Sequence, residues 1–148
     1  MEKEAILAIL FQELTTKEEF LQGELTYLTQ SLENSAKSSA GDKHETDTAM
    51  NQLEQERLHK QLSALKLQQQ TLKQINPQGI HTRCSLGSFI KTTQGIFFIS
   101  VGLGKINHVE GEFTCIHLQS PVGQQLNGKS AGEHFQFGNK QSEILTIY

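Results

Sequence analysis

Two stripes of apolar residues in the first half of the chain constrain the fold more than any other feature. From Glu2 to about Ser35 there is no proline, and apolar residues recur in alternating steps of three and four, as in a coiled-coil seam. A polar segment follows, and the pattern then resumes up to Ile75. The first stripe consists of Leu7, Phe11, Leu14, Leu21, Leu25, Leu28 and Leu32, and the second of Met50, Leu53, Leu58, Leu62, Leu65, Leu72 and Ile75.

The two stripes are mirror images of each other. If the chain folds back near Gly41, residues in contact should have position numbers with a constant sum. For six pairs of stripe residues, from Leu7 with Ile75 to Leu32 with Met50, this sum stays between 81 and 83. Glu18 and Gln69 are the polar exceptions in the two seams. We therefore predict an antiparallel hairpin within one molecule, and a monomer rather than a self-associating coiled coil. Each arm of about 33 residues would be about 50 Å long.

The segment between the arms is a short polar turn that carries two carboxylates. Gly41 can provide a left-handed cap for the first arm, and Asp42 with Glu45 forms a capping-box-like pair for the second. This structural interpretation explains both acids. The alternative is functional, because a tip at residues 41–47 at the far end of a rod can insert carboxylates into the active site of another protein.

Charge is graded along the second arm. Acids cluster toward the tip, and four basic residues, Arg57, Lys60, Lys66 and Lys73, follow with no acid among them. An ordinary solvated helix face accounts for this pattern, and so does a shaft that tolerates phosphates. The net charge of the whole chain is −3, which gives no reason to expect tight binding to free nucleic acid.

The second half of the chain predicts a small β-rich domain. After Pro77 the helical pattern gives way to short apolar runs broken by glycine. Ser120 and Pro121 predict the start of one short helix that ends before Gly128. We predict an α+β chain with a coiled-coil hairpin at residues 1–76 and a β-rich domain at residues 77–148. The expected strands are Arg83–Leu86, Ser88–Thr92, Gly95–Val101, Glu112–His117, His134–Phe137 and Ser142–Tyr148. The expected core consists of Ile90, Phe97, Ile99, Val101, Phe113, Ile116, Leu126, Phe135, Phe137, Ile144 and Ile147.

Signals for enzyme chemistry, metal binding or membrane insertion are weak. Cys84 and Cys115 form no CxxC pair, so a structural zinc site is not expected, and two lone thiols fit a reducing interior. The N-terminus lacks the features of a signal peptide, and the longest apolar run is too short to cross a bilayer. We expect a cytoplasmic protein. His81, His108, His117 and His134 are interpreted as surface or strand residues, and Gly102-Leu103-Gly104 as a turn.

Two motifs together resemble the Gre family of bacterial transcript-cleavage factors. Gly41-Asp42-Lys43-His44-Glu45-Thr46 is similar to the family's tip motif Gly-Asp-x-x-Glu-Asn, with Thr46 in place of Asn. Residues 120–133, Ser-Pro-Val-Gly-Gln-Gln-Leu-Asn-Gly-Lys-Ser-Ala-Gly-Glu, are similar to the family's longer C-terminal motif. The resemblance covers essentially the whole chain, with both motifs in the family's order and spacing.

The resemblance implies a specific function. Gre factors bind RNA polymerase, insert the coiled coil into its secondary channel, and dock an FKBP-like C-terminal domain on the channel rim. Asp42 and Glu45 would then help to hold a second Mg²⁺ in the polymerase active site, and polymerase would cleave its own backtracked transcript near the RNA 3′ end. Arg57 and Lys60 would lie near RNA. The residues implied to contact polymerase are Ser120, Pro121, Gly123, Leu126, Gly128 and Lys129.

Three other interpretations remain open from the sequence. A regulator could occupy the same channel without promoting cleavage, using the acids to compete for metal or to block substrate entry. A peptidyl-prolyl isomerase is conceivable because the C-terminal fold is implied to be FKBP-like, but this half offers few aromatic residues for a proline pocket. A structural coiled coil that self-associates is the third, and the constant register sum argues against it.

Overall fold

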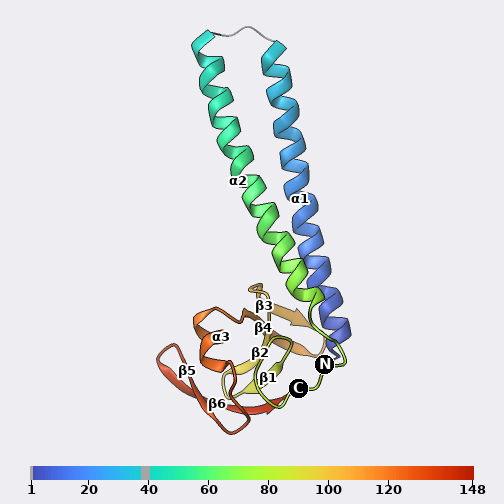
Figure 1. Ribbon diagram of the computed structural model, residues 1–148, viewed down its shortest axis with the longest axis vertical. Coiled ribbons are helices and arrows are strands. Elements are labelled where there is room, and N and C mark those ends of the chain that lie inside the picture. Colours follow the sequence, from blue (N-terminus) through green and yellow to red (C-terminus); the bar gives the residue numbers. More distant parts are fainter. Residues whose placement is uncertain (1, 38–40) are drawn as a thin grey trace. The chain divides into compact units, whose positions relative to one another are not determined.

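The computed structural model describes residues 2–37 and 41–148 (Figure 1). For residues 35–37 and 41–44 it describes the backbone only. Two long helices, α1 (Lys3–Lys37) and α2 (Gly41–Lys73), precede six strands and one short helix. The predicted α+β class is confirmed. Contacts divide the chain into two compact units, one of Ile9–Gln70 and one of Met1–Ala8 with Thr71–Tyr148. Within the described residues, no helix is long and apolar enough to span a bilayer.

The hairpin unit pairs its two helices in antiparallel order, as predicted. The side-chain amide of Gln55 donates to the Thr29 hydroxyl over 3.3 Å, and that of Gln69 donates to the Glu18 carboxylate over 2.9 Å. The position numbers of these pairs add up to 84 and 87, so the register drifts by a few residues from the predicted 81–83. The two polar exceptions in the seams therefore bond to each other, which satisfies groups that would otherwise be costly to bury.

The seam of α2 differs from the prediction in the half nearest the tip. Met50 and Leu53 are 64% and 66% exposed, whereas Asn51 and Gln55 are half-buried. Stepping back from Leu58 by three and four residues gives 55 and 51, which continues the seam. A step of five residues from Leu58 to Leu53 would instead turn the side chain by about 140° away from the seam. The helical period thus outweighs the hydrophobicity of these two residues.

The boundaries of the two arms also shift slightly from those predicted. The helix α1 continues to Lys37, about two residues past the expected end. The helix α2 begins at Gly41, so Asp42 is its second residue rather than the N-cap that the sequence suggested. Residues 38–40 of the predicted turn lie outside the described residues.

The second unit contains a single mixed sheet of six strands in the order β3-β4-β2-β1-β6-β5. Neighbouring strands run antiparallel except β2 and β4, which pair in parallel. The predicted strand at 83–86 is wrong, because Arg83 makes only an isolated bridge to Ser130. The edge strand β3 was missed, and its first residue, Gly104, was assigned to a turn at 102–104. The strands are β1 (Phe89–Thr92), β2 (Gly95–Ser100), β3 (Gly104–His108), β4 (Gly111–His117), β5 (His134–Phe137) and β6 (Lys140–Ile147).

Both faces of this sheet bury apolar side chains, which is why neighbouring residues such as Phe97 and Phe98 are both buried. One face packs against the helix α3 (Pro121–Leu126) through a cluster of Cys84, Ile90, Phe97, Ile99, Ile116, Leu126, Phe135 and Ile144. Val101 and Phe113 are buried, as predicted, but outside this cluster. Phe137, an expected core residue, is 37% exposed on the edge strand β5.

Candidate functional site

The two acids of the tip motif lie at the start of α2. Positions 42 and 45 are three residues apart on this helix, so they share one helical face. Glu45 is exposed. The site therefore offers two positions for carboxylates in the first turns of one helix, close to where the two arms of the hairpin are connected.

Asp42 and Glu45 would bring two oxygen ligands to a metal ion at the tip. No group of three or more His, Cys, Asp or Glu side chains that could hold a metal ion occurs among the described residues. Two carboxylates are hard oxygen donors of the kind that Mg²⁺ prefers, and Mg²⁺ commonly completes its shell with water and other oxygen ligands. The donor chemistry of Asp42 and Glu45 fits a Mg²⁺ that is shared with another protein.

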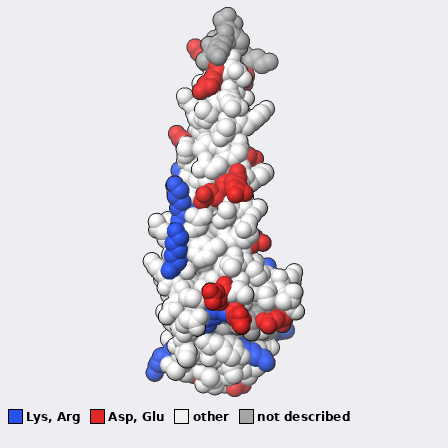
Figure 2. Space-filling view, turned by 90° about the vertical axis from the view of Figure 1, so that its right-hand side faces the viewer, with Lys and Arg blue, Asp and Glu red and all other residues white. Residues whose placement is uncertain are grey.

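The charges along the hairpin are graded as the sequence suggested. In Figure 2, acidic side chains border the tip of the hairpin, and basic side chains appear only farther along it on this face. Arg57 is engaged by Glu54 on the same helix, with Nε 2.9 Å from Oε2 and a second, shorter contact. This contact lowers the pKa of Glu54 and raises that of Arg57. Lys60 is exposed.

The residues of the C-terminal motif shape the helix α3. Ser120 is its N-cap: its hydroxyl accepts from the Gly123 amide over 3.1 Å and donates to the His117 carbonyl over 2.7 Å. Pro121 follows at the first helical position, as predicted. A Cβ on Gly123 would lie 2.2 Å from the His117 carbonyl oxygen, so only glycine allows the helix this close approach.

The remaining motif residues hold this helix on the sheet. Leu126 is fully buried, and Gly128 adopts a φ of 81° while its amide donates to the Cys84 carbonyl. The Lys129 ammonium donates to the His134 carbonyl over 2.7 Å. Of the six residues implied to contact polymerase, Gly123 and Leu126 are buried, and the others, Ser120, Pro121, Gly128 and Lys129, remain at least partly exposed. A partner surface at this motif would use those four.

Cys84 and His81 are two groups outside the motifs whose pKa is shifted. Burial, followed by the charge of Glu133, raises the pKa of the Cys84 thiol to about 11, so the thiol is protonated at neutral pH. His81 is a half-buried loop residue rather than a surface or strand residue, and its Nδ1 lies 3.0 Å from the Ser85 hydroxyl. Burial, with a contribution from Lys3, lowers the pKa of His81.

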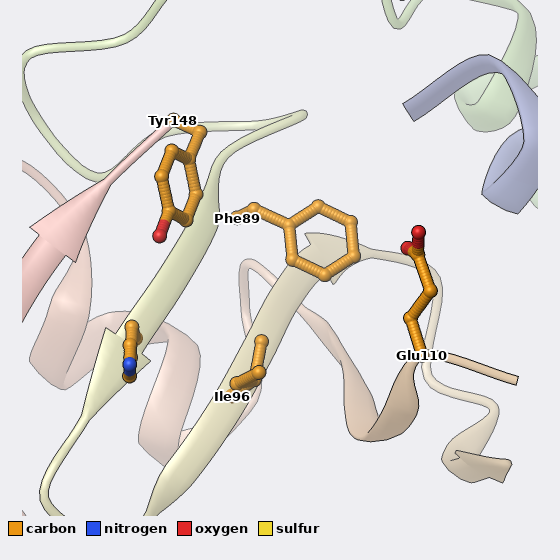
Figure 3. A pocket seen from close by; sticks show the side chains of 5 residues that line it. Phe89, Ile96, Glu110 and Tyr148 are labelled. Atoms are coloured by element: carbon orange, nitrogen blue, oxygen red, sulfur yellow. The ribbon is translucent and has the colours of Figure 1, made fainter. Parts of the chain in front are cut away.

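A hollow on the sheet face opposite α3 was not predicted from the sequence (Figure 3). It is lined by Phe89, Lys91, Ile96, Glu110 and Tyr148. Phe89 and Lys91 lie two residues apart on β1 and therefore on the same face of the sheet. This spacing is the only local sequence pattern that points to the hollow. Glu110 comes from the turn between β3 and β4. Its place beside the sheet could not be predicted, because the strand β3 was not predicted.

Comparisons with known proteins give likenesses in structure. No protein-family model and no curated protein matches the chain. The crystal structure of Thermus aquaticus Gfh1 is similar at 16% identity, covers 93% of each chain and gives a TM-score of 0.35. A structure described as the transcription factor Gfh1 has 16% identity, covers 93% of this chain and 92% of the other, and has a TM-score of 0.36. GreA factor homolog 1 of Thermus thermophilus has 18% identity, covers 96% and 94%, and has a TM-score of 0.34. All three are likenesses at the level of the fold alone.

Proposed function

We propose that this chain is an accessory factor of RNA polymerase that inserts its helical hairpin into the secondary channel and stimulates cleavage of backtracked transcripts. One observation carries the proposal: two helices pair in antiparallel order, and the two acids of the tip motif occupy one face of the first turns of α2. The resemblance of the motifs to the Gre family supports it. The polymerase would provide the nuclease activity, since this chain supplies only carboxylates.

The chemistry that the tip would assist is phosphodiester hydrolysis. Two metal ions about 4 Å apart stabilise the attacking and leaving oxygens of an in-line displacement. Asp42 and Glu45 would hold a weakly bound second Mg²⁺ and orient the attacking water. The hairpin would provide reach, because an arm of about 33 residues extends about 50 Å. Ser120, Pro121, Gly128 and Lys129 would contact the polymerase, with Gly123 and Leu126 fixing the shape of that surface from below.

The test uses purified polymerase stalled in a backtracked complex, with the release of 3′ RNA fragments as the readout. We expect the protein to accelerate this release, and we expect Asp42→Asn or Glu45→Gln to reduce the acceleration at least tenfold. Glu13→Gln is the matched control, because Glu13 is an exposed acid on α1 far along the chain from the tip motif. Fragment release that is unchanged in the Asp42→Asn/Glu45→Gln double variant would overturn the proposed role of the acids.

A second candidate is a channel-binding regulator that does not stimulate cleavage. Lys43 and His44 stand between the two acids and would lower the negative potential that attracts a metal ion. This function predicts inhibition of RNA synthesis without 3′ fragments. The same stalled complex separates the two candidates, because inhibition of RNA synthesis without release of 3′ fragments favours the regulator, and fragment release that depends on Asp42 favours the cleavage factor.

A further inference from the structure

The hollow on the sheet face opposite α3 is a built feature of the second unit. Its volume is about 500 Å³. Ile90 and Phe97 point to the face that α3 covers, so their neighbours Phe89 and Ile96 point to the other face. Lys91 and Ile96 are cross-strand partners on β1 and β2, which places them side by side in the hollow. Figure 3 shows Phe89 between Tyr148 and Glu110.

The floor of this hollow is aromatic and closely packed. Phe89 is only 3% exposed, and its ring stacks on that of Phe98 with centroids 4.6 Å apart. Phe113 meets Phe89 edge-on at 5.4 Å. One wall is Tyr148, whose backbone exchanges hydrogen bonds of 2.8 and 3.2 Å with Phe89. A partner would therefore meet an aromatic ring that its neighbours already hold in place.

The rim of the hollow carries one charge of each sign. Lys91 is exposed on β1, and Glu110 is exposed in the β3–β4 turn, where its carboxylate lies 4.0 Å from Nδ1 of His108. The turn is ordered locally, since the Glu110 amide donates to Nδ1 of His108 over 3.3 Å. An occupant that complements this rim needs an acidic group for Lys91, a basic group for Glu110 and an apolar group for the aromatic floor.

The shape of the hollow favours a segment of protein over a small molecule. Drug-sized ligands are usually enclosed over most of their surface, whereas the Tyr148 wall is 54% exposed. Val109, beside Glu110 in the chain, is 96% exposed and extends the apolar surface beyond the rim. We propose that the hollow binds a partner protein segment that inserts one aromatic or large aliphatic side chain over Phe89, between an acidic residue at Lys91 and a basic residue at Glu110. This proposal is independent of the polymerase role of the tip.

The test titrates synthetic peptides into the isotope-labelled full chain and follows backbone amide shifts by NMR. The probes are acetylated, amidated pentapeptides of the form Glu-Gly-Phe-Gly-Lys, with Glu/Glu and Lys/Lys versions and one with glycine in place of phenylalanine. We expect the Glu/Lys peptide to shift the amides of the five lining residues. The glycine version should bind at least tenfold more weakly, and Tyr148→Ala should weaken binding of the phenylalanine peptide.

Charge reversal makes the proposal sharper, because its outcome does not depend on the direction in which the peptide lies. Lys91→Glu should change the preference to the Lys/Lys peptide, and Glu110→Lys should change it to the Glu/Glu peptide. Lys140→Glu, an exposed charge on β6 outside the lining, should leave the preference unchanged. Three results would each overturn the proposal: no shift at millimolar peptide, a preference that ignores the reversals, or free phenylalanine binding as tightly as the peptide.

Discussion

At the scale of single residues, some features of the C-terminal motif could be predicted from neighbouring residues and others could not. The cap formed by Ser120 and Pro121 could be predicted, because it depends on residues within one turn of each other. The need for glycine at position 123 could not, because it arises from the His117 and Leu118 carbonyl oxygens, which would lie 2.2 and 2.6 Å from a Cβ. A motif residue can thus serve the fold even where a family resemblance implies a partner contact.

His81 gives a prediction about stability and pH. Burial is the main cause of its lowered pKa, and Lys3 adds to it, so the folded state favours the neutral imidazole. The resulting stabilisation is complete above the unfolded pKa of about 6.5 and is lost as the pH falls below that value toward the lower folded pKa. We expect His81→Asn to lose less thermal stability than the wild type between pH 7.5 and 5.5, as measured by circular dichroism.

The control for this pH dependence is His59→Asn, because His59 is exposed on α2. It should lose as much stability as the wild type over the same interval. If His81→Asn and His59→Asn both behave like the wild type, the buried imidazole contributes nothing measurable to the pH dependence.

At the scale of elements, the half of the hairpin nearest the tip is the place to test the observed seam. Asn51 and Gln55 are half-buried there, whereas Met50 and Leu53 are exposed. We expect Asn51→Leu with Gln55→Leu to raise the free energy of unfolding by about 1–3 kcal/mol, because apolar surface would be buried beside the leucines of α1. Urea unfolding followed by helical circular dichroism measures the change.

The matched variant is Met50→Gln with Leu53→Gln. Because both side chains are exposed, it should change the free energy of unfolding by no more than about 0.5 kcal/mol. A loss of several kcal/mol in this variant would mean that the apolar residues form the seam after all, as the sequence suggested, and that the polar seam is wrong.

The helices and strands that show a clear periodic pattern in their own sequence could be predicted best. The hairpin and the strand β5 follow from periodicity, and the structure bears them out. The strand β3 could not be predicted, because it is a short edge strand with no fully buried residue and only one apolar side chain, Ile106. The α2 seam was predicted wrongly for a different reason. The prediction followed the apolar residues Met50 and Leu53 instead of the unbroken steps of three and four residues that helix geometry imposes.

At the scale of the whole molecule, the division into compact units does not follow the change in sequence character. The sequence changes from helical to β-rich near Pro77, yet residues 71–76 and the first eight residues belong to the same unit as the sheet. Lys3 donates to the Gly79 carbonyl over 2.8 Å, and a Cβ on Gly87 would lie 3.0 Å from Cγ2 of Ile75. The base of the hairpin therefore completes the core of the β-rich unit.

This division predicts how buried residues in and just after α2 affect different parts of the chain. Ile75, just past the end of α2, and Leu62 within it are both buried, but they belong to different units. We expect Ile75→Ala to cost about 2–4 kcal/mol and to reduce amide hydrogen-exchange protection in β1 and β2, because a large aliphatic side chain is removed from that unit. Leu62→Ala should instead reduce protection within residues 9–70. Equal losses over the whole chain in both variants would show that hairpin and sheet unfold together, and the two units would then be geometric rather than energetic.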